Sequence, residues 1–377
     1  MIEIFKAAVE KGASDIHLKA GDVIRARLHG KLLPMTKERL NPDQVKGMAL
    51  KLIPKEKDRE NIEELLDYDC SWGVPGLGRI RVNILRQRGS FSIIMRTIPI
   101  EIPTFEDLRM PSVLHDISDA ERGLILVTGV TGSGKSSTMA SMVQHINTRY
   151  QRHIVTLENP IEFLHRDQKS SITQRDIGTD TESFMTGLRA ALRQDPDVIL
   201  IGEMRDTVTI DTGIKAAETG HLVISTLHTK NAYQTISRLL AVFAPEEQEM
   251  IRQRLSEVLV AVVSQRLLPT ADGKGRVPAC EIMVVTSTIR DCIADPTRTH
   301  EIQDLIEEGR QAYGSQSFDQ HLMDLVREEK VDFDTARANA NSPTDFDLKM
   351  NVFGADSSGQ GSSSSQGSGG IDDMFGD

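Results

Sequence analysis

The pattern of apolar and polar residues separates the chain into two regions with different periodicity. In residues 14–35 and 78–98, apolar and polar residues alternate in short runs. Alternation with a period of two is typical of strands with one buried face, so short strands are predicted in both stretches. Between them, residues 42–66 have the pattern of a helix. We therefore expect residues 1–100 to form a small α+β domain.

A proline-rich segment follows this first region. Pro99, Pro103 and Pro111 lie close together, and proline favours extended or turn conformations over regular structure. We place the linker between two domains at residues 101–115.

Beyond the linker, short runs of consecutive apolar residues are separated by longer amphipathic segments. The runs are LILVT, HIVTL, DVILI and HLVIST. Strands that are apolar on both faces and joined by helices indicate a parallel sheet covered on both sides. Residues 116–350 are thus predicted to form an α/β domain. Helices are expected from Pro245 to Leu268, then a hairpin at Gly273 and Gly275, then further helices to about Ala340.

The end of the chain has a different composition. Residues 351–377 contain SSGQGSSSSQGSGG and finish with the acidic and apolar peptide IDDMFGD. Glycine and serine in this proportion are typical of a flexible linker, so this tail is predicted to be disordered. Its final peptide is a candidate docking segment for a partner protein.

Composition and charge exclude several classes of protein. With 377 residues, 39% of them hydrophobic, and a formal net charge of -11, the chain is too acidic to coat nucleic acid through a broad basic surface. Its three cysteines are isolated, which fits neither a disulfide framework nor a zinc site. We find no signal peptide and no apolar run long enough to span a membrane, so we expect a cytoplasmic protein.

One motif carries specific chemistry. Residues 129–136, GVTGSGKS, match the phosphate-binding pattern GxxxxGK[ST] between a predicted strand and a predicted helix. Backbone N–H groups of such a loop surround phosphates, Lys135 reaches the outer phosphates, and the Ser136 hydroxyl binds Mg²⁺. ATP and Mg²⁺ are the predicted cofactors. The nucleotide-binding residues expected in this motif are Gly129, Thr131, Gly132, Ser133, Gly134, Lys135, Ser136 and Ser137.

A carboxylate follows the predicted strand DVILI. Glu203 lies at the end where open parallel sheets bind ligands. There it would orient the attacking water or hold Mg²⁺ through water. A glutamate at the end of a strand is more often a solvent-exposed residue without a catalytic role. The phosphate-binding loop upstream makes the catalytic role the favoured interpretation.

Four stretches together resemble the family of secretion and type IV pilus ATPases. They are GVTGSGKSST at 129–138, TLENPIEF at 156–163, LRQDPDVILIGEMRD at 192–206 and TGHLVISTLHTKNA at 219–232. Their order and approximate spacing agree with the family's Walker A motif, acidic box, Walker B motif and histidine box. The resemblance extends to GASDIHL and GRIRVN in the first region. It implies a RecA-like P-loop core preceded by a PAS-like domain.

The resemblance also implies roles for individual residues. Glu162 joins Glu203, His228 and Lys135 as a catalytic residue, and Glu158 becomes a candidate metal ligand. Where the family usually has Asp, this chain has Asn159, which favours Glu203 and Glu162 over that position. First-domain arginines of the family reach the nucleotide, often across a subunit interface. Arg81 and Arg96 are the candidates here.

Within the family, the chain is most similar to the retraction ATPases of type IV pili. This implies a homo-hexamer that hydrolyses ATP at the cytoplasmic face of the inner membrane. It would act on a membrane-embedded platform protein and, through it, remove pilin from the fibre base. We also expect the chain to lack the additional N-terminal domain and the metal module of assembly and type II secretion ATPases.

Three other functions stay open from the sequence. Residues 288–295, TIRDCIAD, match the retraction pattern AIRNLIRE only in their first half, so an accessory retraction ATPase is one alternative. A different type II or type IV secretion ATPase is the second. A ring-shaped DNA translocase shares the P-loop core, but four tyrosines and one tryptophan offer little for base stacking.

Overall fold

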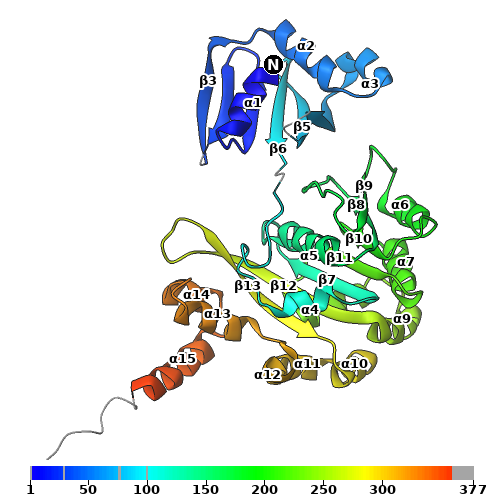
Figure 1. Ribbon diagram of the computed structural model, residues 1–377, viewed down its shortest axis with the longest axis vertical. Helices are drawn as coiled ribbons and strands as arrows, with labels where there is room; N and C mark the ends of the chain where they lie inside the picture. The colour runs from blue at the N-terminus through cyan, green and yellow to red at the C-terminus, as the bar shows by residue number, and fades with distance from the viewer. Residues whose placement is uncertain (1, 29, 75–77, 99–100, 359–377) are drawn as a thin grey trace, which may run out of the picture.

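The computed structural model of the chain describes residues 2–28, 30–74, 78–98 and 101–358, and these residues form two separate sheets with helices packed on them (Figure 1). The predicted fold class, an α/β core preceded by a small α+β domain, is confirmed. The docking peptide proposed at the end of the tail lies outside the described residues.

The first domain is built on a six-stranded antiparallel sheet in the order β3-β2-β1-β6-β5-β4. One buried cluster, which includes Phe5, Ile16 and Ile93, packs its helices on the sheet. The strands are β1 (Asp15–Lys19), β2 (Val23–Leu28), β3 (Lys31–Arg39), β4 (Asp67–Val74), β5 (Gly78–Gln87) and β6 (Ser90–Thr97), and the helices are α1 (Ile2–Glu10), α2 (Pro42–Leu52) and α3 (Glu56–Glu60), followed by a 3₁₀ turn at Ile62–Glu64.

The single helix predicted from Pro42 to Leu66 is interrupted: α2 covers its first half, and the second half holds only the short helix α3 and the 3₁₀ turn. Helix α2 ends at Leu52, because Ile53 adopts an extended conformation and precedes Pro54, which disfavours a helical residue before it. The strand β4 that follows was not predicted. It pairs with β5 along its whole length, so tertiary pairing decided a segment whose own pattern is weak.

The second domain contains a seven-stranded sheet in the order β13-β12-β7-β11-β10-β8-β9, parallel except for β13. Alternate residues of β7 belong to different cores: Leu124 and Leu126 contact the helices on one face, while Ile125 and Val127 contact α5 and the linker on the other. Burial on both faces explains the uninterrupted apolar runs. The strands are β7 (Gly123–Gly129), β8 (His153–Glu158), β9 (Ser171–Asp176), β10 (Val198–Ile201), β11 (Leu222–Leu227), β12 (Leu259–Pro269) and β13 (Arg276–Val284).

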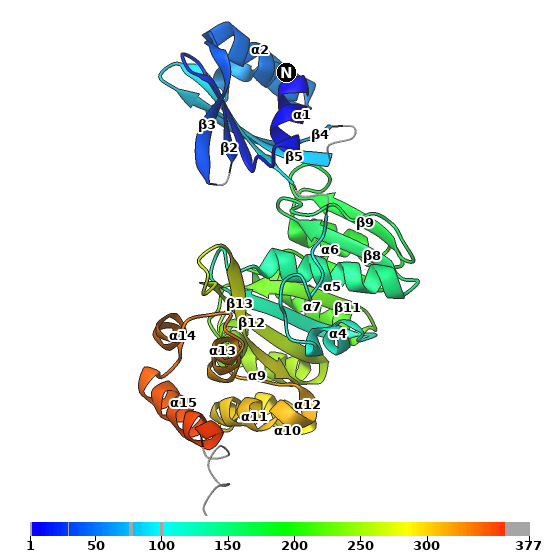
Figure 2. The same ribbon diagram turned by 60° about the vertical axis from the view of Figure 1, so that its left-hand side comes forward.

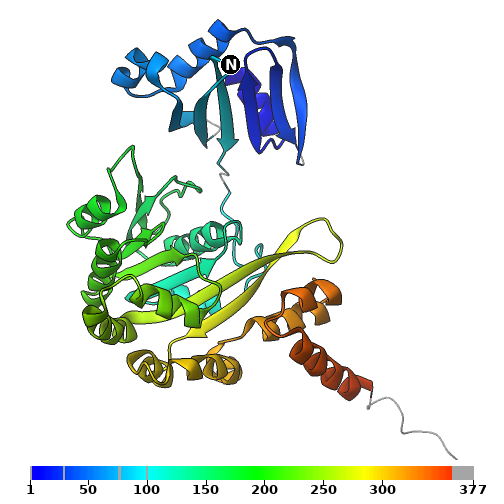
Figure 3. The same ribbon diagram turned by 180° about the vertical axis from the view of Figure 1, so that it is seen from behind.

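Residues 259–268 are a second correction, because they form a strand where a helix was predicted. The preceding helix ends at Val258, and Leu259 is already extended. Strand β12 then pairs with β7 on one side and with β13 on the other. Its β-branched residues fit a strand buried in the middle of a sheet. The hairpin expected at Gly273 and Gly275 joins β12 to β13 and projects from the sheet (Figure 3).

Helices cover both faces of this sheet and continue to the end of the described chain. Helices α13, α14 and α15 pack beside the β12–β13 end, around the buried Phe318 and Phe346 (Figure 2). The helices are α4 (Val113–Ser118), α5 (Lys135–Arg149), α6 (Phe184–Ala191), α7 (Thr207–Glu218), α8 (Ala232–Leu240), α9 (Pro245–Val258), α10 (Ser287–Ala294), α11 (Ile302–Glu308), α12 (Arg310–Tyr313), α13 (Phe318–Arg327), α14 (Phe333–Asn339) and α15 (Pro343–Ser358), with a 3₁₀ turn at Thr299–Glu301.

The C-terminal boundary also differs from the prediction. Helix α15 continues to Ser358, so residues 351–358 are helical although the predicted tail begins at 351. Their local sequence, NVFGADSS, still carries apolar residues that the serine-rich part lacks. Across the described ranges, no helix combines the length and the apolar character needed to cross a membrane.

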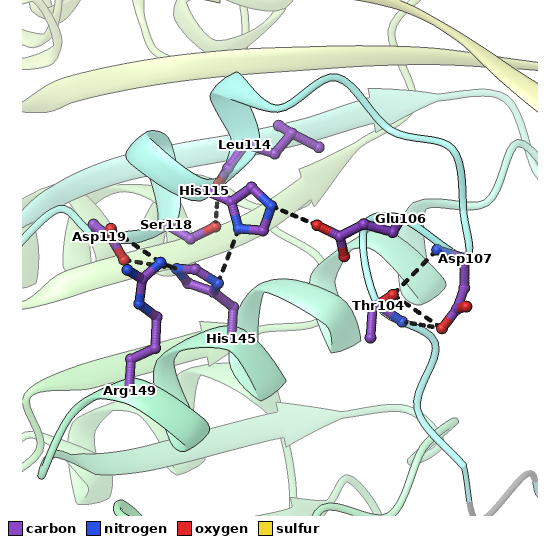
Figure 4. Close-up of polar contacts among 9 residues, drawn as sticks. All are labelled: Thr104, Glu106, Asp107, Leu114, His115, Ser118, Asp119, His145 and Arg149. Carbon is purple, nitrogen blue, oxygen red and sulfur yellow. Dashed lines mark hydrogen bonds and ion pairs between the residues drawn. The ribbon is translucent and has the colours of Figure 1, made fainter.

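The predicted linker forms side-chain contacts with α5, the helix that follows the phosphate-binding loop. Ser141 of α5 donates a hydrogen bond to the Pro103 carbonyl (2.7 Å). His115 of α4 contacts His145 of α5 through their Nδ1 atoms (3.1 Å). The outer nitrogen of each ring meets a carboxylate, Glu106 at 2.9 Å and Asp119 at 2.7 Å (Figure 4). The linker is therefore part of the second domain's packed surface.

We expect Asp119→Asn to destabilise the second domain by about 1 kcal/mol at pH 7, because a charge-assisted hydrogen bond to His145 is weakened. Burial opposes ionisation of Asp119, but the hydrogen bond from His145 holds its pKa below the usual 3.8. A depressed folded pKa gives stability that is present above the unfolded pKa and is lost as the pH falls through the folded pKa.

Urea unfolding at pH 7 and at pH 3 measures this effect, with Asp116→Asn, at an exposed position of the helix that Asp119 follows, as the control. The difference between wild type and Asp119→Asn should shrink at the lower pH. A difference that is equal at both pH values would contradict the assignment.

Candidate nucleotide site

The predicted phosphate-binding loop connects β7 to α5, as its sequence requires. Gly129, Gly132 and Gly134 all have positive φ angles (143°, 80° and 95°), which side chains disfavour. A Cβ atom on Gly129 would also lie 2.5 Å from both the Gln265 carbonyl oxygen and the Ser133 hydroxyl. Glycine at 129 is therefore required by both conformation and space.

Helix α5 begins with its backbone N–H groups facing the loop. The residue before it, Gly134, provides no side-chain cap, so these donors and the positive end of the helix dipole are available to an anion. The Lys135 ammonium group folds back and donates to the carbonyls of Gly129 (2.9 Å) and Val130 (3.0 Å). Burial lowers the Lys135 pKa, while Glu162 and Glu203 oppose the shift.

A cavity of about 530 Å³ lies over this loop. It brings together residues from the ends of β7, β8, β10 and β11, which are far apart in the sequence. Most of the predicted site residues line it: Arg96, Thr131, Gly132, Gly134, Lys135, Ser136, Ser137, Glu158, Glu162, Glu203 and His228. Three others, Gly129, Ser133 and Arg81, are not part of its lining.

Glu203 follows β10 and belongs to a small charged cluster at the cavity wall. Its Oε2 atom lies 2.7 Å from Arg205 Nη2 and 3.8 Å from His228 Nε2. Burial and the nearby positive charge of Lys135 lower the His228 pKa, although Glu203 opposes this. The lowered pKa favours the neutral form of His228.

The acidic box also lines the cavity. Glu158 ends β8, and its Oε1 atom accepts hydrogen bonds from Thr156 (2.7 Å) and from Gln174 Nε2 (3.2 Å). Burial raises the Glu158 pKa, and these two donors act against that rise. Asn159 also lines the cavity and precedes Pro160 through a cis peptide bond.

Several lining residues were missed by motif reasoning. His165 faces the cavity, and burial lowers its pKa to about 4. Arg276 comes from the start of β13, and Phe163 and Phe184 provide apolar wall. None belongs to a recognised chemical pattern except Phe163, which ends the acidic-box match. Only the folded arrangement reveals the other three.

Arg81 and Arg96 stand directly opposite each other on β5 and β6. Each faces a carboxylate of its own domain: Arg96 Nε lies 2.9 Å from Asp15, and Arg81 Nη2 lies 4.0 Å from Asp69. Arg96 alone of the two also lines the nucleotide cavity. Its side chain is 66% exposed, so its guanidinium group is open to a further anionic partner.

The side chains of this cavity could hold Mg²⁺ only if the phosphates of a bound nucleotide supplied the remaining ligands. Among the residues described, no group of three or more His, Cys, Asp or Glu side chains is arranged to hold a metal ion. Magnesium is usually held by one or two protein groups plus substrate phosphates. Ser136 at the start of α5, with Glu203 or Glu158 acting through water, fits that arrangement.

Comparison with known proteins shows the family of the chain. Residues 1–342 match the family described as "Type II/IV secretion system protein". The chain is 42% identical to the "Type IV pilus retractation ATPase PilT" of Pseudomonas aeruginosa over 344 residues, covering 91% of this chain and 99% of that protein. It is 36% identical to the "Type IV pilus ATPase PilU" of the same organism, covering 93% and 91%. A crystal structure of "the Pilus Retraction Motor PilT and Bound ADP" superposes with a TM-score of 0.84 at 42% identity, covering 92% and 99%.

Replacing Lys135 by Ala should reduce ATP hydrolysis by at least about 100-fold, because it removes the cation that would contact the outer phosphates. Steady-state phosphate release by the purified protein measures this effect. Lys37→Ala, on the exposed face of β3, is the matched control and should retain wild-type turnover. If Lys135→Ala kept wild-type turnover, the phosphate-binding loop would not be part of the active site.

Proposed function

The chain belongs to the type II/IV secretion system protein family, and we propose that it is an ATP-driven motor for type IV pilus retraction. The observation that carries this proposal is the convergence of Lys135, Glu203 and His228 on one cavity over the phosphate-binding loop. The similarity to the PilT protein over nearly the whole length of both chains supports the assignment to retraction.

In the proposed reaction, the loop N–H groups and Lys135 hold the phosphates of ATP, and the Ser136 hydroxyl with Glu203 would hold Mg²⁺. Bound Mg²⁺ would neutralise charge that develops on the transferred phosphoryl group. Glu203 accepts a hydrogen bond from the attacking water, orients it and takes up its proton as the water attacks phosphorus. Neutral His228, beside Glu203, donates to an oxygen of the outermost phosphate and so distinguishes ATP from ADP. The Glu162 side chain lies near Lys135 and balances its charge.

We further propose that six copies form a ring and that nucleotide is held between domains. Arg96 reaches the nucleotide cavity from the first domain and would contact ATP and ADP differently, and only a difference of this kind can shift the equilibrium between domain arrangements. The same reasoning extends to Arg81 across a subunit interface. The ring would work at the cytoplasmic face of the inner membrane against a platform protein, and through it release pilin.

The accessory retraction role has less support than the main one. The chain is 36% identical to PilU and 42% identical to PilT. Helix α10 contains residues 288–294 of the segment that matches the retraction pattern only in its first half. Its Ile289, Cys292 and Ile293 side chains are buried, so their role is packing, which other apolar residues can also provide. Arg290 remains exposed, available for a partner in either kind of motor.

Substituting Glu203 by Gln should lower kcat by about 100-fold or more, since an amide orients the water but cannot accept its proton. The affinity for ADP should stay within about threefold of wild type. Phosphate release and titration with a fluorescent ADP analogue measure the two quantities. The exposed Glu182→Gln serves as the control. Unchanged kcat in Glu203→Gln would assign the catalytic role to another carboxylate.

Deleting the gene in its source organism should increase the number of surface pili and abolish twitching motility, because assembly would proceed without retraction. Electron microscopy of pili and a subsurface motility assay measure these results. Expression of wild type should restore motility and Lys135→Ala should not. Loss of pili on deletion would instead identify an assembly motor.

A further inference from the structure

Strand β13 carries a carboxyl group in its buried middle. Glu281 is the one charged residue in the run VPACEIMVV, and only 3% of its surface is exposed. Glutamate is rarely buried to this extent unless a partner satisfies its oxygen atoms. The partner here is a backbone group, because Glu281 Oε1 accepts a hydrogen bond from the Ala232 N–H at 2.8 Å.

The Ala232 N–H group requires an acceptor from outside its own helix. Ala232 is the first residue of α8 and is fully buried. The first N–H groups of a helix have no acceptor within it, and an unpaired N–H group in a buried position costs stability. The N-cap residue Asn231 accepts from Gln234 instead. Glu281, on the edge strand of the sheet, therefore fixes the start of α8.

The start of α8 is also the end of the turn that carries His228. Only residues 228–231 separate β11 from α8, and His228, the first of them, lines the nucleotide cavity. The hydroxyl groups of Thr229 and Thr235 lie 2.7 Å apart and join the turn to the helix. The bond from Ala232 to Glu281 joins this unit to β13. A shift at the start of α8 would consequently shift His228.

We infer that Glu281 is a positioning residue of the proposed ATPase: by holding the start of α8, it places His228 at the nucleotide cavity. The catalytic consequence rests on the proposed function, in which His228 contacts the outermost phosphate. The hydrogen bond to Ala232 and the burial of both groups carry the structural part.

The role requires an oxygen atom at the right distance from β13, and it does not require a charge. Burial raises the pKa of Glu281 to about 7, and the carboxylates of Asp319 and Glu307 add to this effect. The hydrogen bond from Ala232 and the positive charge of Arg266 oppose it. Both the protonated and the ionised carboxyl group have an oxygen that accepts from an N–H group. An amide side chain of the same length should therefore substitute for Glu281.

Three substitutions separate the length of the side chain from its charge. Glu281→Gln keeps the length and an acceptor oxygen, Glu281→Asp keeps the acid but is one methylene shorter, and Glu281→Leu removes the acceptor. Phosphate release should give a kcat near wild type for Glu281→Gln. In the other two variants kcat should fall about 10- to 100-fold, because a displacement of about 1 Å at a catalytic group has an effect of this size. ADP affinity should stay within about threefold, since ADP lacks the phosphate that His228 would contact.

Combining Glu281→Leu with His228→Ala separates positioning from a merely structural role. If Glu281 acts through His228, the double variant should have the same kcat as His228→Ala alone. A general loss of stability would lower kcat equally in both backgrounds. Glu281→Asp takes the place of Glu281→Leu in this comparison if the latter does not fold.

Asp332→Ala is the matched control for the loss of a carboxyl group at a helix start. Asp332 accepts from the Thr335 N–H at the start of α14 (2.8 Å), and no residue of α14 lines the cavity. This variant should have a lower melting temperature and a wild-type kcat.

Hydrogen exchange at the start of α8, measured by mass spectrometry without nucleotide, reads the structural part directly. Exchange of the Ala232 amide should be at least about tenfold faster in Glu281→Asp and Glu281→Leu, and near wild type in Glu281→Gln. If the wild-type protein hydrolyses no ATP, the proposed function is wrong, and these exchange rates still decide whether Glu281 holds α8.

Three results overturn the positioning role while leaving the proposed function intact. The first is a wild-type kcat in Glu281→Asp and Glu281→Leu. The second is a kcat in Glu281→Gln as low as in those two variants. The third is a further loss of kcat when Glu281→Leu is added to His228→Ala.

Discussion

The site depends on the parallel pairing of β8, β10, β11 and β7, because parallel strands direct their carboxyl ends to one edge of a sheet. The register places Ile201 beside Leu157 and Ser225, so the residues that follow these strands arrive together. Glu158, Glu203, His228 and the phosphate-binding loop meet there. The backbone hydrogen bonds between the buried strands bring these residues together, and no direct contact between their side chains is needed.

Burial of charge sets the electrostatics of this edge. Desolvation lowers the pKa of Lys135 and of His228 and raises that of Glu158. Each shift favours the neutral form, and each is opposed by a nearby partner of opposite charge or by hydrogen bonds. Because Lys135 turns back onto the loop carbonyls, an incoming phosphate replaces weak neutral acceptors with a strong charged one.

The packing around α5 connects the site to the rest of the molecule. The helix that carries Lys135 also holds the linker, through Ser141 and the paired rings of His115 and His145. At the other end of that linker, β6 carries Arg96, which lines the cavity. The helix that carries Lys135 thus also contacts the chain segment that follows the first domain.

The sequence alone determined the two domains, the parallel core and the phosphate-binding loop, because these depend on local periodicity and on glycines that no other residue replaces. It also supplied Glu203 and His228, since each directly follows a recognisable apolar strand. Tertiary structure decided what local pattern leaves ambiguous. Residues 259–268 became a strand because β7 and β13 offer partners on both sides, and β4 formed against β5. Arg276 and His165 likewise reach the lining of the cavity only through the fold, because both lie outside the stretches that the sequence motifs match.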